Sequence, residues 1–67
     1  MLYAKDAIKV YIEAQGDKQA LADRLKISRQ TLYNIIGGNP VSEDTASALL
    51  KETGFEQDVA FELIIGS

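Results

Sequence analysis

Residues 18–38 hold two short segments with helical periodicity, separated by a three-residue break, and this stretch constrains the fold more than any other. In the second segment, Leu32, Ile35 and Ile36 recur at the i, i+3, i+4 spacing of a helix face. Ser28 suits its N-cap, because the serine hydroxyl accepts a hydrogen bond from a first-turn backbone N–H. Two glycines and a proline follow the segment and end it. Two short helices joined by a tight turn make a helix-turn-helix.

The opposite side of the second segment carries side chains suited to reading DNA. With the aliphatic residues turned inward, Arg29, Gln30, Tyr33 and Asn34 are expected to face outward. Arginine bonds bidentately to guanine in the major groove, and glutamine or asparagine bonds to adenine. Such residues at the N-terminal end of a recognition helix contact base edges. The pattern therefore predicts binding to double-stranded DNA.

The same stretch fits a known family pattern, in Gln19, Ala22, Leu25, Ile27, Ser28, Leu32, Ile35 and the Gly-Gly-Asn that follows. In these residues the sequence resembles the Cro/repressor class of phage and bacterial regulators, the lambda-repressor-like DNA-binding domains. The resemblance implies an all-α, five-helix domain over residues 1–67, with the helix-turn-helix formed by its second and third helices. One departure is Lys26, where the family usually has glycine with positive φ, so the turn is expected to be strained or differently shaped.

The flanking segments supply the other helices. Residues 1–15 predict a first helix, and Asp17 is the expected N-cap of the second. Residues 41–54 predict a fourth helix, with Ser42 as its cap and Gly54 as its stop.

Residues 56–65 predict a fifth helix with more apolar surface than one core face needs. Val59 and Leu63 are expected to face inward, and Phe61 and Ile65 lie on an adjacent stripe. That excess indicates either a wider core or a subunit interface, and regulators of the resembling class often pair through their last helix. The predicted homodimer interface consists of Phe61, Ile64 and Ile65.

Nine polar residues are predicted to contact DNA: Lys18, Gln19, Ser28, Arg29, Gln30, Thr31, Tyr33, Asn34 and Asn39. Lys18 and Gln19 open the second helix, whose N-terminus commonly abuts a phosphate in this fold. Arg29 and Gln30 are assigned to bases or phosphates. The alternatives are a merely solvated helix surface, and for Asn39 a role in its own turn.

Composition narrows the function further. The 67 residues carry a net charge of −3, divided into +2 over residues 1–40 and −5 over residues 41–67, so the helix-turn-helix lies in the basic half. No cysteine or histidine is present, which removes the usual metal ligands and nucleophile systems. We therefore expect no enzyme, metal, cofactor or small-molecule substrate. With no apolar run of membrane-spanning length, a cytoplasmic location is expected.

The favoured hypothesis is a sequence-specific transcriptional regulator, a Cro-type repressor that occludes a two-fold symmetric operator as a homodimer. The alternative is a helix-turn-helix module that binds another protein, such as an antirepressor or antitoxin-like partner. The acidic pI of about 4.7, the missing turn glycine and the apolar last segment favour that alternative.

Overall fold

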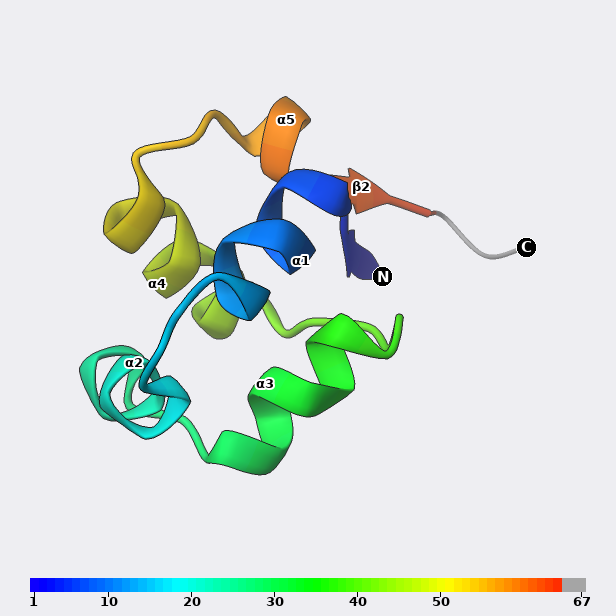
Figure 1. The fold of residues 1–67 in the computed structure, drawn as a ribbon. Helices are drawn as coiled ribbons and strands as arrows, with labels where there is room; N and C mark the ends of the chain where they lie inside the picture. The colour runs from blue at the N-terminus through cyan, green and yellow to red at the C-terminus, as the bar shows by residue number, and fades with distance from the viewer. Residues whose placement is uncertain (65–67) are drawn as a thin grey trace.

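The computed structural model describes residues 1–64, which form five helices and a two-stranded sheet (Figure 1). The elements are β1 (Leu2–Ala4), α1 (Asp6–Glu13), α2 (Lys18–Leu25), α3 (Arg29–Ile36), α4 (Glu43–Thr53), α5 (Gln57–Ala60) and β2 (Phe61–Leu63). In Figure 1, α1 lies at the centre of the view, with α2 and α3 on one side of it and α5 on the other. Within the described residues, no helix has the length and apolar character needed to cross a membrane.

The three helix starts predicted from cap residues are confirmed. In each case the capping side chain accepts a hydrogen bond from the backbone N–H three residues further on, at 3.1 Å for Asp17, 3.2 Å for Ser28 and 3.3 Å for Ser42. Each cap supplies an acceptor to an N–H that the helix itself leaves unpaired. These local bonds fix where α2, α3 and α4 begin.

The turn between α2 and α3 has the geometry that glycine would give it. Lys26 ends α2 in the left-handed conformation, with φ 59° and ψ 41°. The backbone N–H groups of Lys26 and Ile27 donate to the carbonyls of Asp23 and Ala22 at 3.2 and 3.0 Å. The positive φ expected at this position is confirmed. Lys26 therefore takes the left-handed conformation in which glycine is usual, at the cost of some backbone strain.

The two ends of the described chain differ from the all-α prediction. The first helix begins at Asp6 and not at the first residue, and the last helix ends at Ala60. The segments outside these limits pair as antiparallel strands, with Leu2 opposite Leu63 and Ala4 opposite Phe61. The fold is therefore mostly helical, with a small sheet that joins the segments before α1 and after α5. Strand pairing satisfies the backbone groups that a longer helix would have paired internally.

One hydrophobic core lies between the helices and under the sheet. Its fully buried large side chains come from α1, α2, α3 and α4, and are Ile8, Ile12, Leu21, Leu32, Ile35 and Leu49. β2 contributes Phe61, which is only 3% exposed. Val59 and Leu63, which were expected to face inward, are 51% and 61% exposed. The predicted fifth helix is confirmed only over Gln57–Ala60. The expectation that Val59 and Leu63 face inward is wrong, because Val59 lies on the exposed side of α5 and Leu63 lies at the exposed end of β2.

Candidate nucleic-acid interface

α3 presents one buried face and one solvent-exposed face, as its sequence predicts. Leu32 and Ile35 lie in the core. Arg29, Gln30 and Asn34 are exposed, and the Tyr33 side chain is 50% exposed. We call the outward set of Arg29, Gln30, Tyr33 and Asn34 the α3 ridge. It offers guanidinium, amide and phenol groups on a single helix, all free of the core.

A polar groove separates the ridge from the start of α2. It has a volume of about 270 Å³ and is lined by Gly16, Asp17, Lys18, Gln19, Arg29 and Tyr33. Four of the nine residues predicted to contact DNA therefore come together here, two from each helix of the helix-turn-helix. The groove holds the cationic side chains of Lys18 and Arg29 and one carboxylate, that of Asp17, which caps the N-terminus of α2. The charged side chains in the groove therefore sum to a positive charge, to which the dipole of α2 adds. Such a groove suits an anionic oxygen.

A second groove lies on the other side of the ridge. It has a volume of about 370 Å³ and is lined by Thr31, Asn34, Ile35, Asn39, Pro40, Val41, Ser42 and Thr45. Three more of the nine predicted residues, Thr31, Asn34 and Asn39, meet in it. Ser42 and Thr45 lie beside the ridge and were not predicted to do so from the sequence. Their position depends on how the chain turns from α3 into α4, and the residue pattern holds no signal for that turn.

Ser28 and Thr31 form a hydroxyl pair at the start of α3. Their side-chain oxygens lie 2.9 Å apart, within hydrogen-bond distance, and Ser28 also caps the helix. Both residues lie beside the ridge, with Ser28 exposed and Thr31 half-buried. Ser28 therefore has a structural role whether or not it meets DNA.

Three side chains of α2 are already engaged within the protein. Lys18 Nζ donates to the Gln15 carbonyl at 3.4 Å. Gln19 Nε2 donates to Asp23 Oδ1 at 3.0 Å. Arg24 Nε donates to Glu52 Oε1 at 2.7 Å, which ties α2 to α4. That hydrogen bond raises the pKa of the Arg24 guanidinium above its ordinary value, so the group stays charged in any buffer in which the protein is studied. Arg24 is thus a structural cation outside the two grooves beside the ridge.

The residues predicted to form the dimer interface have separate positions. Phe61 lies in the core, so its assignment to a subunit interface is corrected. Ile64 directly follows β2 and is 48% exposed. Ile65 lies outside the described residues. The predicted interface helix does not extend this far, since α5 ends at Ala60.

Together, the fold and the α3 ridge define a helix-turn-helix domain of the repressor class. The chain belongs to the family of bacteriophage CI repressor helix-turn-helix domains, whose family model matches residues 6–59. The chain is therefore a regulator domain of a DNA-binding class. The match ends before β2 and takes in both helices of the helix-turn-helix. No curated protein and no solved structure matches the chain significantly.

Proposed function

We propose that this protein is a sequence-specific repressor that lays α3 in the major groove of double-stranded DNA and blocks its operator by occupancy. The observation that carries the proposal is the exposed α3 ridge beside the polar groove that it forms with the start of α2. Base-reading groups project from the helix, and the groove that holds Lys18 and Arg29 is suited to a phosphate that borders a major groove. The proposed DNA contacts are the nine residues predicted from the sequence. The cytoplasm is the proposed location, since an operator is reached there.

We further propose that the repressor acts as a homodimer, because paired half-sites require two recognition helices. The outer edge of β2 is the surface we assign to this pairing. The sheet has two strands, and the other edge of β1 is covered where the Val41 N–H donates to the Leu2 carbonyl at 2.7 Å. β2 has no second paired neighbour within residues 1–64. An unpaired edge is a template for a strand of another chain.

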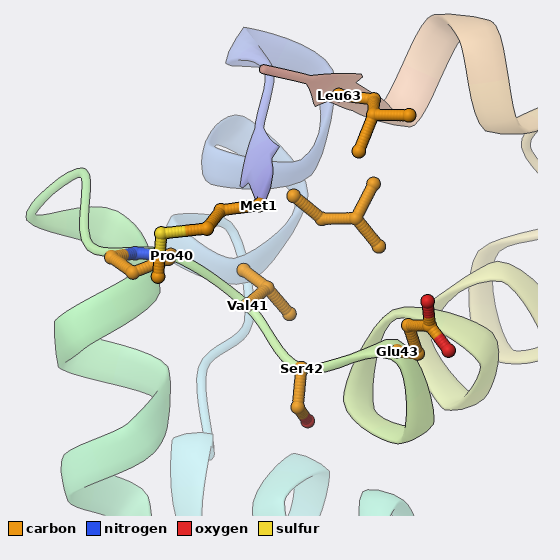
Figure 2. Close-up of a pocket in the computed structure, with 7 residues that line it drawn as sticks. Met1, Pro40, Val41, Ser42, Glu43 and Leu63 are labelled. Atoms are coloured by element: carbon orange, nitrogen blue, oxygen red, sulfur yellow. The ribbon is translucent and has the colours of Figure 1, made fainter. Parts of the chain in front are cut away.

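The hydrogen-bond pattern of the sheet supports pairing centred on Leu63. Met1 and Ile64 exchange two backbone hydrogen bonds, at 2.9 and 2.7 Å, so the neighbouring Leu63 N–H and C=O point away from β1. A two-fold axis at Leu63 would let these groups pair with their copies and keep Glu62 away from its own copy. Leu63 also lines a groove of about 370 Å³ on the face of the sheet (Figure 2), together with Met1 and Leu2 and with Pro40, Val41, Ser42 and Glu43 from the far side of β1. A second copy at this edge would bring apolar area against the exposed Leu63 side chain.

The alternative function is a module that binds another protein and no DNA. The exposed apolar side chains of Met1 and Leu63 beside the acidic α4 start favour it. The two functions differ in their response to salt. DNA binding releases counterions from each phosphate that is neutralised, so its affinity falls steeply as the salt concentration rises. The affinity of an apolar protein interface changes little with salt.

The test is the salt dependence of duplex binding. If Lys18 and Arg29 of each copy neutralise one phosphate apiece, the slope of log association constant against log salt should be about −3 to −4. Lys18→Gln should make the slope less negative by about 2 for a dimer. Lys51→Gln is the matched control, because Lys51 is an exposed lysine on α4 away from the ridge. No duplex binding at low salt, or a slope that Lys18→Gln leaves unchanged, would reject the proposal in its present form.

A further inference from the structure

Two amide side chains on the α3 ridge are hydrogen-bonded to each other. Gln30 Nε2 donates to Asn34 Oδ1 at 3.1 Å. The two residues are four positions apart, so they lie one above the other on the same face of the helix. Both are exposed, and neither is needed to pack the core. The bond therefore connects two groups on the surface that we propose to face DNA.

This bond restricts what Gln30 offers to a base. A free primary amide can rotate to present its oxygen and its N–H groups in either order. Donation to Asn34 directs the nitrogen side of the Gln30 amide toward Asn34. The Gln30 oxygen and one remaining N–H are then left for another partner. The Gln30 amide therefore presents an acceptor, its oxygen, beside a donor, its remaining N–H, and the hydrogen bond to Asn34 fixes their relative order before any ligand binds.

An acceptor beside a donor is what adenine requires in the major groove. Adenine presents its N6 amino group as a donor and N7 as an acceptor, whereas guanine presents two acceptors. Asn34 already uses one lone pair of its oxygen to accept from Gln30, and its Nδ2 H groups are turned away from that bond. The two side chains thus divide their roles, with Gln30 suited to the base and Asn34 suited to hold it.

We propose that Gln30 reads one adenine and that Asn34 acts as its positioning residue, so that both determine specificity at a single A·T pair. The inference rests on the proposed function, because it requires α3 to enter the major groove. It adds the identity of a base and a coupling between two residues. Independent contacts by Gln30 and Asn34 to different bases are the competing arrangement, and they predict separate losses.

The test starts from the duplex that the wild-type protein binds best in a random pool. Each base pair of one half-site is exchanged in turn, and Kd is measured for the wild type, Gln30→Ala, Asn34→Leu, the double variant and Asn34→Asp. The wild type should prefer A·T at one position by about tenfold or more. Gln30→Ala and Asn34→Leu should each reduce that preference to less than about threefold, and the double variant should lose no more.

Asn34→Asp separates positioning from direct contact. The aspartate keeps an acceptor for Gln30 Nε2 and loses the N–H donors. We expect weaker binding to every duplex, because the variant brings a negative charge to the phosphates, but an unchanged preference for A·T at the same position. If the Asn34 N–H groups instead contacted the base directly, Asn34→Asp would abolish the preference for A·T at that position.

Gln19→Ala is the matched control, because Gln19 also donates to a residue four positions on, but from α2. It should change overall affinity without changing the preferred base at the Gln30 position. A Gln30→Ala or Asn34→Leu variant that keeps the wild-type preference would overturn this inference and leave the proposed function intact. A wild type that selects no duplex would overturn both.

Discussion

At the scale of single residues, Lys26 shows how the turn of the helix-turn-helix is maintained without glycine. A side chain at φ 59° costs of the order of 1 kcal/mol through its contact with the backbone. The cost is tolerated because Lys26 and Ile27 both donate to helix carbonyls, and Ser28 begins the next helix directly. Capping bonds on both sides of the turn therefore determine its shape.

Replacing Lys26 with glycine should stabilise the protein. Relief of about 1–2 kcal/mol of left-handed strain is set against roughly 0.5–1 kcal/mol of added chain entropy in the unfolded state, which leaves a gain of up to about 1.5 kcal/mol. Lys26→Val should be less stable than wild type by more than about 1 kcal/mol. Urea denaturation measures both free energies of unfolding. The account of the turn is wrong if Lys26→Gly unfolds at a lower urea concentration than wild type.

At the scale of secondary structure, the sequence predicts the helix-turn-helix well and the ends of the chain poorly. The caps at Asp17, Ser28 and Ser42 and the stop at Gly54 act on neighbouring residues, so local pattern is sufficient for them. Phe61 and Leu63 lie two residues apart around a glutamate, a spacing that a strand and a short helix both accommodate. Residues 61–63 form a strand because they pair with β1, which lies about sixty positions away along the chain. Local periodicity does not contain that information.

The candidate site shows the same limit. The outward side of α3 follows from its own period, so Arg29 and Gln30 are predicted correctly as exposed residues. The groove lined by Ser42 and Thr45 depends on the path between α3 and α4. The bond between Gln30 and Asn34 could have been anticipated from their i, i+4 spacing, and the sequence analysis did not use it.

A pair of substitutions in β2 distinguishes the strand from the predicted helix. Phe61→Leu should lower the free energy of unfolding by about 1–2 kcal/mol, because the ring fills the core. Leu63→Ala should change it by less than about 0.5 kcal/mol in the monomer, because this side chain is exposed. Urea denaturation at low protein concentration measures both. The predicted helix, with Leu63 facing inward, would make Leu63→Ala the more destabilising substitution. That result would contradict the observed strand.

At the scale of the whole molecule, charge divides the chain into a basic half, residues 1–40, and an acidic half, residues 41–67. The basic half holds α2 and α3, and the acidic half holds α4, α5 and β2. The acidic half should lower non-specific attraction to DNA, so the proposed binding would depend on base contacts and on two copies acting together. The proposed pairing edge at β2 lies outside both grooves that flank the α3 ridge.

Pairing through β2 predicts a dimer that depends on Leu63. Leu63→Ser should weaken self-association by at least about tenfold, because it removes apolar area at the proposed two-fold axis. Val59→Ser is the control, because Val59 is a similarly exposed apolar residue that lies on α5. Sedimentation velocity over a range of concentrations measures both variants. Equal weakening by the two substitutions would remove β2 as the pairing surface.

The central claim is that α3 reads base edges from the side that carries Arg29 and Gln30. Selection of bound sequences from a random duplex pool tests it most directly. The account predicts a two-fold symmetric consensus whose half-sites lie about 10 base pairs apart, and its loss in the double variant Arg29→Ala, Gln30→Ala. A wild-type pool that shows no enrichment, or a consensus that survives in the double variant, would contradict it.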